Sequence, residues 1–299
     1  MNRRTFLRDL AVGGAVLHWA PRFIAGQGTV PAGVPELAII EGDFPSEITK
    51  AAVAALGGMQ TFIARGDKVL IKPNIGWDRT PEMAACTNPE VVKALVELVQ
   101  AAGARHVTVI DNTTNEAKRC YVRSGILDAV RSMGASMPYA DESRVKKVTL
   151  HGEWLKEWDV LTDVLEADKI INVPIAKHHS LCRLTMGLKN WLGALGGARN
   201  QLHQDLDRAL VDLAAFFKPA LTVLDAYRIL VRNGPQGGRT SDTKLVKTVV
   251  AGRDPVAVDA VGAGFFGIQP QELLYLKLAQ ERGLGKFEWE KLRVEKRKI

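Results

Sequence analysis

Two kinds of apolar pattern alternate along the chain. Short uninterrupted apolar runs predict buried strands at residues 69–71, 106–110, 169–175, 220–224 and 247–251. Longer segments with apolar residues every three or four positions predict amphipathic helices, which begin at Asn88, Asp205 and Asp254. Uninterrupted apolar strands separated by such helices indicate an α/β fold: a mostly parallel sheet with helices on both faces, in three layers.

Polar side chains follow the predicted strands. They are Lys72 and Asn74, Asp111 and Asn112, Lys177 and His179, Asp225, and Asp254. Because ligands of open parallel sheets bind beyond the carboxyl ends of the strands, we expect these residues to form one polar crevice. The alternative is that they are ordinary loop residues and helix caps; Asp254, which precedes a proline, has the position of an N-cap.

Lysine is the most informative residue type among these. Its charge opposes the dipole at a helix start, so capping does not explain it there. We therefore predict that Lys72, Lys177 and Lys189 bind a shared anionic ligand rather than act as solvated loop charges. Lys189 and Arg199 lie in a glycine-rich stretch, residues 187–199, which has neither Walker nor dinucleotide-binding spacing.

The remaining candidates are assigned by their chemistry. A histidine titrates near neutral pH in its ordinary state, so His179 is predicted to move a proton, with Asp225 or Asp259 as its partner. An ordinary hydrogen-bonded loop histidine is the alternative. The predicted catalytic residues are His179, Lys177 and Asp225; the predicted substrate-binding residues are Lys72, Asn74, Lys189, Asn190, Asp254 and Asp259.

Metal and disulfide chemistry have weaker support. A metal-dependent hydrolase that uses His179, His203 and Asp205 is a third possibility, but the chain has no HExxH motif or His/Cys cluster, and we assign no metal ligands. The three cysteines (Cys86, Cys120 and Cys182) form neither a disulfide framework nor a CxxC motif.

Composition and charge limit the class of protein. The chain has 299 residues, of which 46% are hydrophobic and 24% charged, so it can bury a large core. Most of the net charge of +7 lies in residues 1–27 and 286–299, which leaves the rest nearly neutral. A nucleic-acid-binding protein should carry its basic stripe on the folded part, so we expect no nucleic-acid partner.

The N-terminal sequence predicts an export signal. Arg3 and Arg4 precede a short apolar stretch, residues 10–20, which is too short to span a membrane. This order resembles the twin-arginine signal, which predicts passage through the twin-arginine translocon and a periplasmic or other extracytoplasmic location. The alternative is an amphipathic first helix of a cytoplasmic protein. The expected organisation is a signal segment (1–27), a single α/β domain (28–285) with an irregular insert near 113–168, and a solvated charged tail (286–299).

Several motifs together resemble a known family. They comprise residues 70–74, 87–92, 167–174, 177–179, 188–190 with Gly193, 225, 234–235 and 254–259. Over residues 65–285 the chain resembles the family called domain of unknown function 362, whose Lys-Thr-His motif maps its lysine and histidine onto Lys177 and His179. Many relatives carry a ferredoxin-like segment with cysteine-ligated iron–sulfur clusters, which implies redox chemistry for them. This chain lacks those cysteines, so we expect no iron–sulfur cluster from it.

These patterns predict an exported α/β enzyme that acts on or with an anionic small molecule or cofactor, in a role related to redox chemistry. The alternative is a non-catalytic ligand-binding or assembly factor for an exported redox partner protein. The sequence names neither the cofactor nor the reaction.

Overall fold

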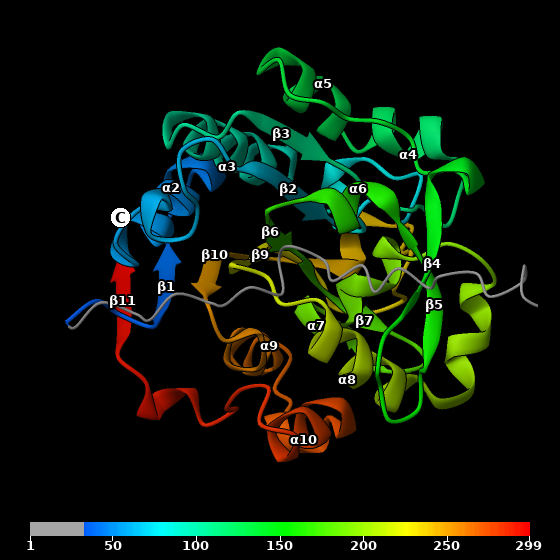
Figure 1. Ribbon diagram of the computed structural model, residues 1–299. Helices are drawn as coiled ribbons and strands as arrows, with labels where there is room; N and C mark the ends of the chain where they lie inside the picture. The colour runs from blue at the N-terminus through cyan, green and yellow to red at the C-terminus, as the bar shows by residue number, and fades with distance from the viewer. Residues whose placement is uncertain (1–32) are drawn as a thin grey trace, which may run out of the picture.

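A mixed sheet runs through residues 33–299, the part of the chain that this computed structural model describes (Figure 1). Nine strands of these residues form it, in the order β11-β1-β10-β9-β6-β2-β3, with β7 pairing with β8 and β9. Only β10 and β8 run against the others, so the sheet is mostly parallel, as predicted. The strands are β1 (Leu37–Glu41), β2 (Lys68–Pro73), β3 (His106–Val109), β6 (Lys169–Val173), β7 (Ile175–His179), β8 (Arg183–Thr185), β9 (Leu221–Leu230), β10 (Thr243–Gly252) and β11 (Val294–Lys298).

Helices cover both faces of this sheet, which confirms the three-layer α/β fold. In Figure 1, α2 (Pro45–Ala55), α3 (Pro89–Ala101), α4 (Ala117–Arg123) and α5 (Ile126–Ser132) lie above the sheet. Below it lie α7 (Gly187–Asn190), α8 (Leu206–Phe216), α9 (Pro255–Gly264) and α10 (Leu274–Glu281). Successive side chains of β2 point to opposite faces of the sheet. Val69 and Ile71 pack in the core above the sheet, and Leu70 packs in the core below it.

Proline divides the strand that the apolar run at 169–175 predicts. Pro174 has no N–H to donate to the ladder, and it separates β6 from β7. Strand β6 pairs with β2 and β9, whereas β7 pairs with β9 and β8. Lys177 and His179 therefore lie within β7 rather than in a loop after a strand.

The expected irregular insert contains regular structure. Besides α4 and α5, it holds α6 (Thr162–Glu166) and a two-stranded sheet of β4 (Val145–Thr149) and β5 (Glu157–Leu161). Strand β5 supports the glycine-rich stretch, because the Asp159 carbonyl accepts from the Gly196 N–H at 2.8 Å and Trp158 Nε1 donates to the Gly196 carbonyl at 3.0 Å.

The end of the chain is also more regular than expected. Residues 294–298, expected to be a solvated tail, form β11, which pairs in parallel with β1. The side chains of Lys296, Arg297 and Lys298 are exposed, so the charge pattern indicated their solvation but not the strand that carries them.

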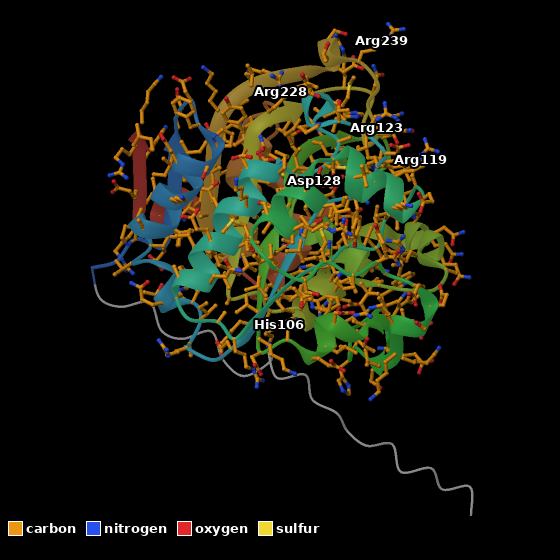
Figure 2. All side chains as sticks on the ribbon, turned by 90° about the horizontal axis from the view of Figure 1, so that it is seen from above. His106, Arg119, Arg123, Asp128, Arg228 and Arg239 are labelled. Carbon is orange, nitrogen blue, oxygen red and sulfur yellow. The ribbon has the colours of Figure 1, made fainter. Side chains whose placement is uncertain are left out.

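Charged side chains cover the outside of the molecule. Figure 2 shows four labelled arginines along one side: Arg119, Arg123, Arg228 and Arg239. Two of them, Arg119 and Arg123, form ion pairs with the buried Asp78, so their charge is partly compensated within the chain. Among residues 33–299, no helix is long and apolar enough to cross a membrane. The predicted signal, residues 1–27, lies outside the described residues.

Strand β6 should be critical for stability, because its neighbours β2 and β9 both pair with Ile171, which is fully buried. We expect Ile171→Ala to lower the free energy of unfolding by about 2–5 kcal/mol, through lost burial and an internal cavity. Urea denaturation measures this effect. As a control, Leu245→Ala removes a side chain that is 43% exposed and should cost about 0.5 kcal/mol or less. Equal losses in the two variants would contradict this picture of the core.

Candidate functional site

A buried ion pair joins the carboxyl ends of β2 and β3. Lys72 Nζ lies 2.6 Å from Asp111 Oδ1, and the two side chains are 1% and 2% exposed. The other carboxylate oxygen of Asp111 accepts from the Ile75 N–H at 2.6 Å, and Lys72 also donates to the Pro73 carbonyl at 3.0 Å. Burial lowers the pKa of Lys72, and the charge of Asp111 opposes that shift.

Glycine is needed where the chain crosses this pair. A Cβ on Gly193, in the short 3₁₀ segment η5 (Trp191–Ala194), would lie 1.8 Å from Asp111 Oδ1 and 2.8 Å from Lys72 Nζ. The Gly193 carbonyl also accepts from the Asn112 N–H at 2.8 Å. The glycine-rich stretch thus approaches the strand ends as closely as a backbone can.

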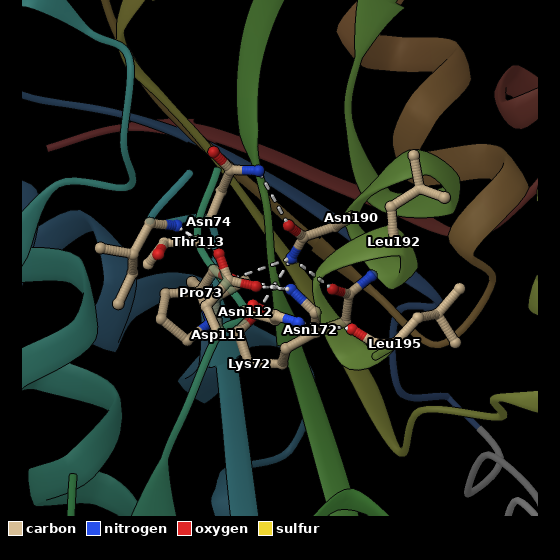
Figure 3. A network of polar contacts seen from close by, with 12 residues as sticks. Lys72, Pro73, Asn74, Asp111, Asn112, Thr113, Asn172, Asn190, Leu192 and Leu195 are labelled. Carbon is tan, nitrogen blue, oxygen red and sulfur yellow. Dashed lines mark hydrogen bonds and ion pairs between the residues drawn. The ribbon is translucent and has the colours of Figure 1, made fainter. Parts of the chain in front are cut away.

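Three asparagines form a hydrogen-bonded row beside the ion pair (Figure 3). Asn74 Nδ2 donates to Asn190 Oδ1 at 3.1 Å, and Asn190 Nδ2 donates to Asn172 Oδ1 at 2.8 Å. Asn172 Nδ2 in turn donates to the Gly187 carbonyl at 2.9 Å, while Asn190 Nδ2 also contacts the Lys72 carbonyl at 3.1 Å. This row fixes the orientation of all three amides and links β2 and β6 to α7.

A pocket of about 540 Å³ opens beside this network. It is lined by the ends of β2, β3 and β7 and by residues of the 187–203 segment. The structure brings five of the predicted site residues together in its lining: Asn74, Lys177, His179, Lys189 and Asn190. Trp77, Leu181 and Leu192 add apolar surface.

Three cations line the pocket without a carboxylate partner among residues 33–299. Lys177 Nζ donates to Asn74 Oδ1 at 2.9 Å and to the Ala85 carbonyl at 2.5 Å. Arg199 donates to backbone carbonyls, including those of Asn112 and Thr113 at 2.8 Å each. Lys189 is 6% exposed, and its ammonium group makes no hydrogen bond or ion pair within the described chain. The pocket is therefore strongly positive.

Burial shifts the titration of these groups. It lowers the pKa of Lys177 to about 8, with a further contribution from the charge of Lys189, and it also lowers the pKa of Lys189 and Arg199. Desolvation is the main cause of each shift, and the charge of Asp111 opposes it at Lys177 and Arg199 without forming an ion pair with either. An anion in the pocket would supply negative charge and raise these pKa values again.

His179 differs from the sequence-based expectation. Burial, together with the positive charges of Lys189 and Lys177, lowers its pKa to about 3, so the ring is neutral at physiological pH. Its Nδ1 accepts from the Leu181 N–H at 3.1 Å, so the neutral ring carries its proton on Nε2. His179 is thus suited to donate a hydrogen bond rather than to act as a general base. The adjacent His178 instead accepts from the Gly234 N–H.

Asp225 and Asp259 lie outside the pocket lining. Asp225 is buried within β9 and accepts from the backbone N–H groups of Asn88 and Tyr227 at 2.8 and 3.0 Å. Asp259 accepts from those of Gly187 and Leu188 at 2.6 and 2.9 Å. Burial raises their pKa values to about 6 and about 7, respectively. Neither aspartate hydrogen-bonds to His179, so the predicted pairing is wrong; both hold backbone instead.

The expectation that Asp254 belongs to the crevice is also wrong. Its strand, β10, runs antiparallel to β9, so the carboxyl end of β10 lies at the opposite edge of the sheet. There Asp254 caps α9, accepting from the N–H groups of Val256 and Ala257 at 2.8 and 2.9 Å. Lys72 is not among the residues that line the pocket; its ammonium group pairs with Asp111, which does line it.

The sequence analysis named Asp111 at a strand end and Arg199 in the glycine-rich stretch but gave neither a site role, because only the fold shows what they contact. Thr185 lines the pocket with a buried hydroxyl that has no partner among the described residues, and no sequence signal marks it. His203 lines the pocket too, whereas Asp205 caps α8. Within residues 33–299, no group of three or more His, Cys, Asp or Glu residues is placed to hold a metal.

An α/β protein with a cationic pocket at the carboxyl ends of parallel strands is the class that this geometry defines. The chain belongs to the family described as "Domain of unknown function (DUF362)", which matches residues 69–264 and thus includes every pocket residue discussed here. A thylakoid-associated protein of Synechocystis sp. is 28% identical over 238 residues, covering 77% of this chain and 72% of that protein.

Two solved structures are distantly similar. The lactate racemase apoprotein of Thermoanaerobacterium thermosaccharolyticum aligns with a TM-score of 0.49 and 10% identity, over 80% of this chain and 58% of that one. A protein from Thermotoga maritima aligns with a TM-score of 0.41 and 12% identity, over 79% and 59% of the two chains. The chain thus spans less than two thirds of either structure.

The close approach of Gly193 gives a specific prediction. A methyl group at this position would displace the Asp111 carboxylate, which Lys72 and the Ile75 N–H hold in place. We expect Gly193→Ala to lower the free energy of unfolding by about 1–3 kcal/mol, as overpacking of a closed site does. Urea denaturation should separate it from Gly264→Ala, where an added Cβ meets nothing within 4 Å. A Gly193→Ala protein as stable as the unsubstituted one would refute the packing described here.

Proposed function

We propose that this protein is an enzyme that binds a small organic anion, as substrate or cofactor, in the cationic pocket. The observation that carries the proposal is Lys189: a lysine that is only 6% exposed, lines the pocket, and has no hydrogen-bond or ion-pair partner for its ammonium group among residues 33–299. Lys177 and Arg199 add two further cations that hydrogen-bond only to neutral oxygens.

The energetic argument concerns desolvation. Removing a charge from water without pairing it is costly, and buried charges in stable proteins are usually paired. Here Asp111 pairs with Lys72, but no other carboxylate among residues 33–299 forms an ion pair with Lys177, Lys189 or Arg199. A bound carboxylate or phosphate would supply the missing negative charge and pair with these cations through charge-assisted hydrogen bonds. The volume of about 540 Å³ suits a small metabolite or a cofactor fragment.

Reactive chemistry is the reason to favour an enzyme over a carrier. A carrier needs cations that stay charged, whereas Lys177, with a pKa of about 8, can exchange a proton near neutral pH. Next to it, the neutral His179 can donate a hydrogen bond from Nε2 to a polarised oxygen of the ligand. The anticipated redox role gains no support from the cysteines, whose buried thiols have raised pKa values.

Loss of Lys189 should weaken anion binding. We expect Lys189→Gln to reduce the affinity for small carboxylates and phosphates by about 10- to 100-fold, the effect of losing one charged hydrogen bond. Isothermal titration with inorganic phosphate, pyruvate and citrate tests this. Lys169→Gln is the matched control, because Lys169 stands at the opposite, amino end of β6 and should leave binding unchanged. If none of the anions binds the unsubstituted protein, or if both variants bind alike, the proposed function fails.

We further propose that the protein is exported through the twin-arginine route. The support is the order of Arg3, Arg4 and the short apolar stretch that follows. Replacing both arginines by lysine should retain the protein in the cytoplasm, as measured by cell fractionation with a reporter fused after residue 32. The same fusion with Arg3 and Arg4 unchanged is the control and should be exported. Unchanged export of the doubly substituted fusion would overturn this assignment.

A further inference from the structure

Lys177 has an unusual setting for a lysine. Its side chain is 1% exposed, yet it lines the pocket. No carboxylate within residues 33–299 forms an ion pair with it, whereas Lys72, which is equally buried, is held by Asp111. Burial is the main factor that favours its neutral form, and the positive charges of Lys189 and Lys72 act in the same direction, while Cys86 and Asp111 act against it without forming an ion pair.

The hydrogen bonds of Lys177 match a neutral amine. An uncharged amine has two N–H donors and one lone pair. Asn74 Oδ1 and the Ala85 carbonyl accept from Lys177 Nζ, and these two acceptors would use both donors. The Asn74 amide cannot turn freely, because its Nδ2 donates to Asn190. The lone pair is then the part of the nitrogen without a protein partner, next to an open pocket.

We propose that Lys177 is a nucleophile that forms a Schiff base with the aldehyde or keto group of an anionic substrate. This inference rests on the proposed function, since Lys189 and Arg199 would bind the anionic group of the same molecule. It narrows the substrate class from anions in general to anions that carry a reactive carbonyl, of which 2-oxo acids are the simplest.

The step balances without any further reactant. The nitrogen of the neutral amine attacks the carbonyl carbon, forming a C–N bond and a carbinolamine. The C–O bond then breaks, and the oxygen leaves as water with the two hydrogens that the amine nitrogen has lost. Nothing is oxidised or reduced. His179 Nε2–H is available to hydrogen-bond to the oxygen as negative charge develops on it.

A desolvated lysine close to another cation is an established way to activate an amine for this chemistry. With a pKa of about 8, half of Lys177 is unprotonated at pH 8, whereas an ordinary surface lysine titrates near pH 10.5. Reaction at Lys177 should therefore increase with pH through about 8 and then level off. Reaction at surface lysines should continue to increase up to about pH 10.

Borohydride trapping tests the proposal directly. Reduction of an imine with sodium borohydride fixes the substrate carbon on the amine, and mass spectrometry detects the added mass. We expect pyruvate to label the unsubstituted protein at a single site, which peptide mapping assigns to Lys177, at least tenfold faster than any surface lysine at pH 7.5. Lys177→Arg should abolish this labelling, and Lys169→Arg should leave it intact. Acetone, which lacks the anionic group, should label at least tenfold more slowly.

The outcomes separate this inference from the proposed function. Anions that bind in calorimetry while pyruvate and glyoxylate leave Lys177 unlabelled would overturn the Schiff-base assignment but not the anion pocket. Labelling spread over surface lysines at similar rates would also overturn it. Because peptide mapping of the unsubstituted protein locates the label, the result does not depend on the folding of the Lys177→Arg variant.

Discussion

The ion pair between Lys72 and Asp111 is the contact around which the site is assembled. It joins the ends of β2 and β3 in a buried position, where removing one partner would leave an unpaired charge at a cost of about 3–5 kcal/mol. Asp111 also fixes the chain at Ile75, and only a glycine at position 193 allows the glycine-rich stretch to cross the pair. The Asp111 carboxylate therefore holds both the ends of β2 and β3 and the position of the glycine-rich stretch beside them.

The other cations of the pocket are arranged differently. No carboxylate among residues 33–299 pairs with Lys177, Lys189 or Arg199; Lys177 and Arg199 donate to amide and carbonyl oxygens, and the ammonium group of Lys189 has no such partner there. Such an arrangement lowers the stability of the unliganded protein, because buried charge is desolvated without being paired. Proteins commonly concentrate unfavourable electrostatics of this kind at sites that bind ligands. Asp225 and Asp259 do not line this pocket; their carboxylates accept hydrogen bonds from backbone N–H groups elsewhere.

The same surroundings exchange the expected roles of two residues. A histidine is the usual group that titrates near neutral pH, and a lysine is usually a fixed charge. In this pocket, burial beside other cations lowers the pKa of His179 to about 3, so the ring is neutral at physiological pH. The same factors lower the pKa of Lys177 to about 8, close to physiological pH. The histidine thereby becomes a hydrogen-bond donor, and the lysine becomes the group that can react. The direction of both shifts follows first from burial and then from the neighbouring positive charges.

The sequence by itself determined the α/β class and most of the central strands, because apolar runs are local features, and it marked Asn74, Lys177 and Lys189 as candidates for one site. Tertiary structure alone decided which strand ends share an edge. The antiparallel pairing of β10 carried Asp254 to the far edge of the sheet, and no local pattern encodes a strand's direction. It also decided the pKa of His179, since burial and neighbouring charge come from segments distant in sequence.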